Sequence, residues 1–132
     1  MDNRELLNRA VMAAKSAYAP YSGFSVGAAL LCSDGTVFTG CNIENSSYSV
    51  TVCAERVALF SAVAAGYRGF TAIAIVGGNN GDYTKPCPPC GVCRQALAEF
   101  CSADTKVILS DGQGDACDYT LGELLPESFS LR

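Results

Sequence analysis

The apolar positions in the first third of the chain follow a helical period and then a strand period. Over residues 4–17 apolar side chains recur every three or four positions, which predicts a helix that Pro20 ends. Two shorter apolar runs, 25–32 and 36–41, predict strands. Because the Asp34-Gly35 pair between them can adopt positive φ at low cost, we expect the two strands to form a β-hairpin.

The rest of the chain alternates between helical and strand patterns. Alanines at helical spacing predict a helix over 53–65 that stops at Gly66. Residues 71–76 are almost continuously apolar, which is typical of a central strand covered on both faces. The remaining predicted elements are a helix over 90–100, a strand over 106–109, a short strand over 116–119 and a helical turn that begins at Thr120 with a capping box and stops near Pro126.

Together these elements predict an α/β protein with a three-layer α/β/α architecture, in which helices flank a mixed sheet of about five strands. The chain has 132 residues, enough for one hydrophobic core and too few for two. It contains no repeat, low-complexity segment or linker, so we expect a single domain over 1–132.

Composition and charge narrow the choice of partners. Hydrophobic residues make up 49% of the chain and charged residues 17%, which predicts that some apolar surface closes against other subunits. The net charge of −4 argues against a nucleic-acid partner and favours a small neutral or cationic substrate. No apolar run approaches the roughly 20 residues that cross a bilayer, so no membrane partner is expected. The charged start, Met1 to Glu5, lacks an apolar signal core and predicts a reducing, cytoplasmic location.

The chain has eight cysteines and no histidine. Without histidine, Ser-His-Asp and Cys-His catalysis are excluded, and any zinc site must use sulfur or carboxylate ligands. An even number of cysteines also fits a secreted disulfide scaffold. The charged N-terminal residues make that interpretation the weaker one.

Two short stretches carry the candidate chemistry, Cys53-Ala54-Glu55-Arg56 and Pro89-Cys90-Gly91-Val92-Cys93. The C-x-x-C pair can grip one metal ion, and Cys53 supplies a third thiolate. Three protein ligands leave a fourth position open, as in catalytic zinc sites, and Glu55 can then transfer protons for a metal-bound water. Both stretches begin predicted helices, whose N-terminal dipoles favour thiolates.

An arginine follows the metal-binding residues in each stretch, Arg56 in the first and Arg94 in the second. Three thiolates around one dication form an anionic centre, which weakens zinc as a Lewis acid. We therefore expect Arg56 to hydrogen-bond the sulfurs and restore the acidity of the bound water. Arg94 either shares that role or is an ordinary surface arginine.

The other five cysteines are interpreted separately. Cys87 completes a C-x2-C-x2-C run of the iron–sulfur kind, but the next ligand position of such a run is Leu97. We therefore interpret Cys87 as a non-ligand. Small buried hydrophobic side chains are the simplest interpretation of the remaining four, which are Cys32, Cys41, Cys101 and Cys117.

The ordered motifs resemble the cytidine deaminases, specifically the small homotetrameric nucleoside type, over nearly the whole chain. The first metal stretch and the Pro-Cys-x-x-Cys run are similar to the three-cysteine form of the zinc deaminase signature. The matching segments are Ala19-Pro20-Tyr21-Ser22, Phe24, Val26-Gly27-Ala28-Ala29-Leu30, Gly40-Cys41-Asn42-Ile43-Glu44-Asn45, Cys53-Ala54-Glu55-Arg56, Pro89-Cys90-Gly91-Val92-Cys93-Arg94-Gln95 and Glu123-Leu124-Leu125-Pro126.

The resemblance implies a set of site residues. Cys53, Cys90 and Cys93 would bind one zinc ion per subunit, with Glu55 as the proton shuttle. Asn42 and Glu44 would hold the ribose hydroxyls, a role that an amide and a carboxylate suit chemically. Phe24 would pack on the nucleoside, and Tyr48 and Phe129 would be aromatic walls supplied across subunit boundaries. The implied substrate contacts are Phe24, Asn42, Ile43, Glu44, Asn45, Ser46, Ser47, Tyr48, Ala54 and Phe129.

The resemblance also implies an activity. The protein would be a hydrolase acting on the C–N bond of a cyclic amidine, converting cytidine and 2′-deoxycytidine to uridine and 2′-deoxyuridine in pyrimidine salvage. A zinc-bound hydroxide would attack C4 of cytosine while Glu55 protonates N3 and later the leaving amino group, releasing ammonia. The implied assembly is a cytoplasmic homotetramer with active sites shared between subunits.

Three other functions stay open at this point. A structural zinc or interaction module would need a fourth ligand, either Cys87 or Cys41. An editing deaminase acting on RNA or DNA is disfavoured by the acidic charge and by the absence of a basic groove. A deaminase for a cytosine-bearing antibiotic is disfavoured by the Asn42 and Glu44 pair, which suits ribose.

Overall fold

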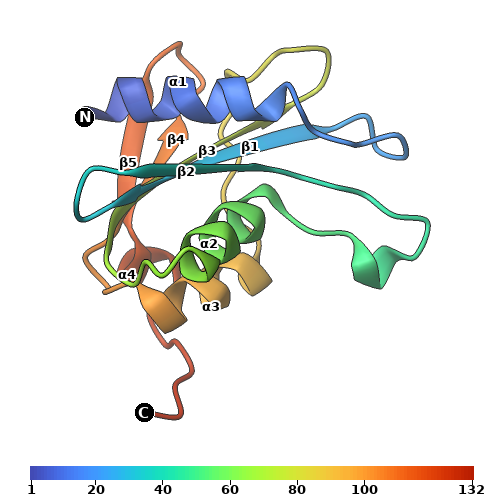
Figure 1. Cartoon of the computed structure of the whole chain (residues 1–132). Coiled ribbons are helices and arrows are strands. Elements are labelled where there is room, and N and C mark those ends of the chain that lie inside the picture. The colour runs from blue at the N-terminus through green and yellow to red at the C-terminus, as the bar shows by residue number, and fades with distance from the viewer.

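A mixed five-stranded sheet separates one helix from the other three (Figure 1). The computed structural model describes all residues, 1–132. The strand order is β2-β1-β3-β4-β5, in which only β3 and β4 are parallel neighbours. The elements in chain order are α1 (Asn3–Ala14), β1 (Ser25–Cys32), β2 (Val37–Cys41), the 3-10 helix η1 (Tyr48–Val50), α2 (Ala54–Ala64), β3 (Phe70–Gly78), α3 (Gly91–Phe100), β4 (Lys106–Ser110), β5 (Ala116–Thr120) and α4 (Leu121–Leu124).

Each face of the sheet has its own hydrophobic core. Helix α1 packs on one face, where Leu6, Leu7 and Ala10 meet alternate residues of the central strands. Helices α2, α3 and α4 pack on the other face, where Leu59, Leu97 and Leu121 meet the opposite set of strand residues. Strand β3 contributes to both cores and is buried almost throughout, which confirms the central strand predicted from its apolar run. The three-layer α/β prediction is likewise confirmed.

The element boundaries agree with the sequence pattern except at the first helix. The hairpin between β1 and β2 forms as predicted, although of its two turn residues only Gly35 has a positive φ, of 92°. Helix α1 ends at Ala14, short of the predicted 17 and well before Pro20. The reason is tertiary: Tyr18 donates its backbone N–H to the Asn42 carbonyl and accepts one from Glu44, which pulls the chain out of the helix.

Close packing against β2 fixes the helix that carries the first candidate ligand. A Cβ atom on Gly40 would lie 2.4 Å from the Ala54 carbonyl oxygen and 2.5 Å from the Ala58 nitrogen. Only glycine therefore allows α2 to approach β2 this closely. No helix in the structure has both the length and the apolar character needed to cross a membrane.

Candidate metal centre and nucleoside site

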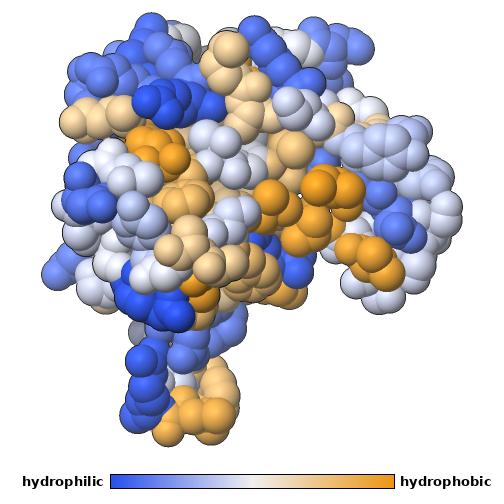
Figure 2. Space-filling view, viewed as in Figure 1, coloured by the Kyte–Doolittle hydropathy of each residue, from blue (hydrophilic) through white to orange (hydrophobic).

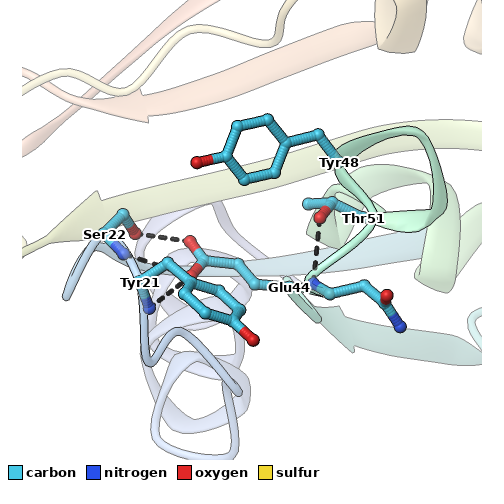
Figure 3. A pocket seen from close by; sticks show the side chains of 6 residues that line it. Tyr21, Ser22, Glu44, Tyr48 and Thr51 are labelled. Atoms are coloured by element: carbon cyan, nitrogen blue, oxygen red, sulfur yellow. Dashed lines mark hydrogen bonds between the residues drawn. The ribbon is translucent and has the colours of Figure 1, made fainter.

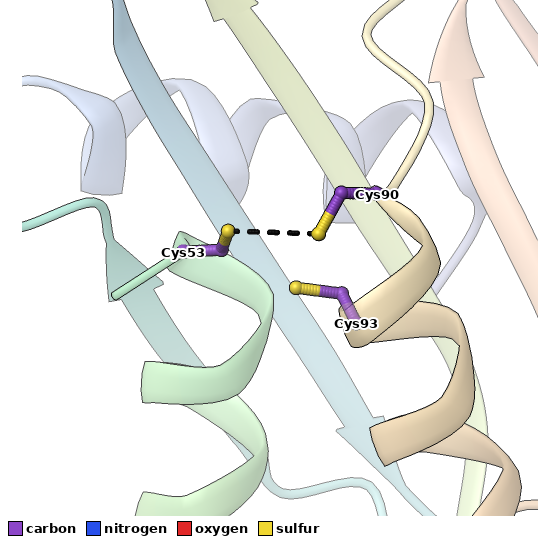
Figure 4. Close-up of side chains that lie close together, drawn as sticks. All are labelled: Cys53, Cys90 and Cys93. Atoms are coloured by element: carbon purple, nitrogen blue, oxygen red, sulfur yellow. Dashed lines mark hydrogen bonds between the residues drawn. The ribbon is translucent and has the colours of Figure 1, made fainter. Parts of the chain in front are cut away.

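The first turns of α2 and α3 bring three cysteines together (Figure 4). Cys53 is the N-cap of α2, Cys90 is the N-cap of α3, and Cys93 lies one turn into α3. Neither N-cap side chain accepts a capping hydrogen bond from its helix, and both thiols point into the gap between the helices (Figure 4). The three sulfur atoms all lie within 4.8 Å of one another.

This arrangement fits zinc. The Sγ atoms of Cys53 and Cys90 are 3.8 Å apart, and the edge of a tetrahedral site with Zn–S bonds of about 2.3 Å is about 3.8 Å. No fourth cysteine or carboxylate joins the cluster, which leaves one coordination position for water or substrate. Beside it, the Glu55 Oε1 atom is buried and has no hydrogen-bond partner. A closed structural zinc site would lack both features.

Without a metal, the pKa values of the Cys53 and Cys93 thiols shift in opposite directions. The pKa of the Cys53 thiol is lowered because the Cys93 thiol donates a hydrogen bond to it, with further stabilisation of the thiolate from Arg56 and Cys90. The pKa of Cys93 is raised because its proton is held in that hydrogen bond and because the side chain is buried. One thiolate is thus already favoured before any metal is bound, as a zinc site requires.

The two arginines have different roles. Arg56 donates a hydrogen bond from Nη2 to the Cys53 sulfur over 3.4 Å, as expected. Arg94 donates to two carbonyl oxygens, those of Pro89 and Leu124, each at 2.8 Å. Arg94 therefore ties the loop before α3 to the C-terminal end of α4, and Arg56 is the arginine that contacts the cysteines.

Glu55 is the buried acid next to the sulfurs, with 4% of its surface exposed. Desolvation raises the pKa of its carboxyl group to about 7, and the negative charge of Cys53 adds to the increase. A carboxyl group with a pKa near neutrality both accepts and releases protons readily at physiological pH. Burial of a carboxylate without a partner is costly, which is typical of a functional rather than a structural position.

Cys87 stands apart from the metal cluster. It is half-buried, and desolvation raises the pKa of its thiol to about 11, which disfavours the thiolate that metals bind. All eight cysteines are free thiols, so the structure is no disulfide scaffold. The three-sulfur cluster likewise does not match a four-cysteine iron–sulfur site. Of the remaining four cysteines, Cys32 is buried and the others are half-buried.

Phe24 and Cys87 meet over a glycine of the central strand. A Cβ atom on Gly77 would lie 2.8 Å from Cε2 of Phe24 and 2.5 Å from the Cys87 sulfur. The absence of a side chain at position 77 therefore leaves the space that the Phe24 ring occupies. The negative charges of Glu55 and Cys53 also contribute to the raised pKa of the Cys87 thiol.

A second part of the site is a cavity of about 300 Å³ around Glu44 (Figure 3). Oε1 of Glu44 accepts hydrogen bonds from the backbone N–H groups of Tyr21 and Ser22, and Oε2 accepts one from the Ser22 hydroxyl. These bonds lower the pKa of the carboxyl group, the Ser22 hydroxyl contributing most. Figure 3 shows the Tyr48 and Tyr21 rings on opposite sides of the carboxylate.

Asn42 is buried and already engaged by the strand next to it. Its Oδ1 atom accepts the Val26 N–H, and its Nδ2 atom donates to the Phe24 carbonyl oxygen, each at 2.9 Å. The side-chain amide therefore replaces backbone pairing where β1 begins. One N–H group and one lone pair remain for a ligand.

The other expected contacts are divided between the cavity and the surface. Asn45 lines the cavity, the Ser46 hydroxyl bonds to the Tyr21 hydroxyl, and the Ser47 N–H bonds to the Asn45 side chain. Ile43 is half-exposed and pairs through its backbone with Val52, and Ala54 is fully buried at the start of α2. Phe129 lies in the C-terminal segment and is not in the cavity lining.

Three residues of the cavity lining were not predicted as contacts, namely Tyr21, Ser22 and Thr51. Tyr21 and Ser22 belong to a motif that carries the resemblance, but nothing in their spacing indicates that they bond to Glu44, which is 22 or 23 positions away. The Thr51 hydroxyl accepts a hydrogen bond from the Asn45 N–H and so holds the loop in place. The only feature of the sequence that could have indicated Tyr21 and Ser22 as site residues is the polar turn directly after Pro20.

Comparisons with known proteins agree with this geometry. The family model for the cytidine and deoxycytidylate deaminase zinc-binding region matches residues 1–110. A cytidine deaminase of Halalkalibacterium halodurans is 53% identical over 98% of this chain and 96% of its own length, and one of Sporosarcina psychrophila is 50% identical over 98% and 93%.

Solved structures give the same result. The crystal structure of a Burkholderia pseudomallei cytidine deaminase is 50% identical, with a TM-score of 0.89 over 98% of this chain and 100% of that one. That of a Mycobacterium tuberculosis cytidine deaminase is 41% identical, with a TM-score of 0.80 over 96% of both chains. Full-length identity at this level and a three-cysteine centre with an adjacent buried acid place the chain in the cytidine deaminase family of zinc-dependent hydrolases.

Proposed function

We propose that the protein converts cytidine and 2′-deoxycytidine to uridine and 2′-deoxyuridine by hydrolysis, releasing ammonia as a step of pyrimidine salvage. The observation that carries the proposal is the buried Glu55 carboxyl group, unpartnered at Oε1, beside three converging sulfurs with an open fourth position. A metal centre that only stabilised the fold would have no use for such a group.

Glu55 performs the proton transfers. Zinc held by Cys53, Cys90 and Cys93 would supply the Lewis acid that lets water ionise near neutral pH. Glu55 takes one proton from the attacking water and delivers it to N3 of the cytosine ring as the new C4–O bond forms. It then carries a second proton from that oxygen to the amino group, which leaves as ammonia when the C4–N bond breaks. Its pKa of about 7 suits both directions of transfer.

Glu44 and Asn42 bind the ribose. Three of the roughly four acceptor positions of the Glu44 carboxylate are filled by the protein, so about one remains for a sugar hydroxyl. The spare N–H group and lone pair of Asn42 allow it to donate to one hydroxyl and accept from another. The remaining loop residues, Ile43 and Asn45 to Ser47, shape this end of the site.

The negative charge at Glu44 also disfavours a 5′-phosphate. The lining of the Glu44 cavity contains no lysine or arginine that could pair with one. We therefore expect the nucleoside to be preferred to the corresponding nucleotide. The net charge of −4 argues against an RNA or DNA substrate.

The active enzyme is a cytoplasmic homotetramer of one-domain subunits that share their active sites. Tyr48 is 83% exposed and Phe129 68% exposed, which suits rings that contact a neighbouring subunit. The cavity around Glu44 includes none of the three cysteines, which is consistent with a site that a second chain helps to enclose. Figure 2 shows apolar surface between α2 and the segment that carries η1, which a neighbouring subunit would cover. Eight free thiols fit a reducing compartment.

Ultraviolet absorbance during incubation with cytidine, 2′-deoxycytidine and cytidine 5′-monophosphate tests the proposal. We expect conversion of both nucleosides, little conversion of the nucleotide, and a colourless protein with one zinc per subunit. An intact, zinc-loaded protein that converts neither nucleoside contradicts the proposed function. A brown protein containing iron contradicts the metal assignment.

A further inference from the structure

The chain beyond α4 runs past α3 and away from the sheet (Figure 1). This tail, residues 125–132, has no helix or strand of its own. Its two large apolar side chains near the end, Phe129 and Leu131, are 68% and 92% exposed. Figure 2 shows the tail projecting from the body with apolar atoms at its tip. Such a segment keeps a ring in one place only if something ties its backbone down.

Gln95 provides that tie. Its Nε2 group donates to the Phe129 carbonyl oxygen at 2.8 Å, and its Oε1 atom accepts the Phe129 N–H at 3.2 Å. The side-chain amide thus satisfies both backbone polar groups of one residue, as a neighbouring strand would. Two bonds to the same residue fix both its position and its orientation, which a single bond does not.

Two other side chains of α3 hold the tail on either side of this point. Arg94 donates to the Leu124 carbonyl oxygen where the tail begins. Arg132 at the end of the tail bonds to the Glu99 carbonyl oxygen and pairs with its carboxylate at 3.1 Å. Between them, Gln95 makes the hydrogen bonds to the backbone of Phe129 itself. The same helix carries Cys93, so the metal centre and the tail share one rigid support.

We propose that Gln95 is a positioning residue that holds the Phe129 ring ready for the nucleoside site of a neighbouring subunit. The proposal rests on the proposed function and on the role of Phe129 across the subunit boundary. Because the backbone that carries the ring is held in advance, substrate binding need not order the tail. Gln95 therefore acts on substrate binding and not on the proton transfers.

Variants of Gln95 measure this effect. Gln95→Ala removes both bonds, and we expect KM for cytidine to rise about tenfold with kcat changed far less. Gln95→Glu keeps the acceptor for the Phe129 N–H but sets a carboxylate oxygen against the Phe129 carbonyl oxygen, so KM should rise at least as much as in Gln95→Ala. Gln113→Ala replaces an exposed glutamine in the turn between β4 and β5 and is the matched control. Zinc content and Tm establish that each variant is folded and metal-loaded.

A double-mutant cycle separates positioning from general damage. If Gln95 acts through Phe129, then Gln95→Ala has no further effect on KM in a Phe129→Ala background. An equal increase in KM in both backgrounds overturns the proposal, because Gln95 would then act through another contact. A Phe129→Ala variant with unchanged KM also overturns it, because the ring would have no role to position.

The tail can also be observed without turnover. The chain contains no tryptophan, so Phe129→Trp introduces a single fluorescent reporter. We expect Gln95→Ala to lower the fluorescence anisotropy of this reporter, whereas Gln113→Ala leaves it unchanged. An unchanged anisotropy shows that Gln95 does not hold the tail and overturns the proposal. Wild-type protein that fails to deaminate cytidine contradicts the proposed function instead, so the two failures are distinguishable.

Discussion

Arg56 donates a hydrogen bond to the sulfur of Cys53 over 3.4 Å, so one cation lies directly against the anionic metal centre. The hydrogen bond to Cys53 is the main reason that the pKa of the guanidinium is raised, and the charge therefore persists at every accessible pH. The arginine offsets part of the negative charge that three thiolates bring to a dication. A neutral side chain at this position would leave the sulfurs as stronger electron donors and the metal as a weaker acid.

Replacing Arg56 tests this interpretation. We expect Arg56→Gln to reduce kcat for cytidine about 10- to 100-fold, or to weaken zinc binding by a similar factor. Steady-state kinetics and zinc content by mass spectrometry measure the two effects. Arg9→Gln, at an exposed position of α1, is the control. Full activity and full zinc content in Arg56→Gln would show that the charge of Arg56 is dispensable.

Glu55→Gln tests the proton transfers. Glutamine keeps the shape of the side chain but cannot accept and release a proton, so we expect kcat to fall about 10²- to 10⁴-fold. The zinc content should stay at one per subunit, because Glu55 is not among the three clustered sulfur ligands. Deamination at a near wild-type rate would mean that another group carries the protons.

Glu55 also makes the stability of the metal-free protein depend on pH. Desolvation raises the pKa of its carboxyl group from 4.5 to about 7. Between these values the folded protein keeps a proton that the unfolded chain releases, so the free energy of unfolding decreases as the pH rises through this window. Glu55→Gln avoids this cost and should be more stable than wild type by roughly 3 kcal/mol at about pH 8, but not below about pH 4.5.

Urea unfolding of the chelator-treated proteins at several pH values measures this difference. Glu127→Gln, at an exposed position near the C-terminus, is the matched control. If Glu55→Gln and wild type unfold at the same urea concentration near pH 8, burial does not penalise the Glu55 carboxylate as described.

Gly77→Ala tests the packing of Phe24. The added methyl group would lie 2.8 Å from the Phe24 ring and 2.5 Å from the Cys87 sulfur, so the ring must move. We expect KM for cytidine to rise several-fold and Tm to fall, since overpacking costs about 1–3 kcal/mol. Cys87→Ala in the same chain removes one of the two clashes and should restore part of the loss. Unchanged KM in Gly77→Ala would mean that Phe24 does not contact the substrate.

The single variants Cys87→Ala and Cys90→Ala distinguish a bystander from a ligand. Cys87 lies outside the three-sulfur cluster, so its variant should keep one zinc per subunit and its turnover. Cys90 is one of the three, so its variant should lose zinc or bind it far more weakly. Loss of zinc from Cys87→Ala would support a closed structural site in place of an open one.

The sequence predicts this fold well where the signal is local. The apolar run of β3, the Asp34-Gly35 hairpin and the capping box of Thr120 and Glu123 each depend on neighbouring residues and are present in the structure. The clustering of Cys53, Cys90 and Cys93 is also as predicted: C-x-x-C spacing pairs Cys90 with Cys93, and the resemblance to the zinc deaminase signature adds Cys53.

Features that depend on distant segments could not be predicted. Helix α1 ends early because Tyr18 pairs with the backbone of Asn42 and Glu44. The Ser22 hydroxyl donates a hydrogen bond to the Glu44 carboxylate. The Asn42 side-chain amide accepts one from the Val26 N–H and donates one to the Phe24 carbonyl oxygen. The two bonds between Gln95 and Phe129 join residues 34 positions apart. No pattern within one element records such contacts, since only the tertiary fold creates them.

The most direct test of the central claim is a titration of the metal-free protein with zinc, following the rate of cytidine deamination by ultraviolet absorbance. The account predicts no turnover without metal, and a rate that rises linearly and levels off at one zinc per chain. Turnover that is independent of zinc, or a protein that binds one zinc per chain and leaves cytidine unchanged, would contradict it.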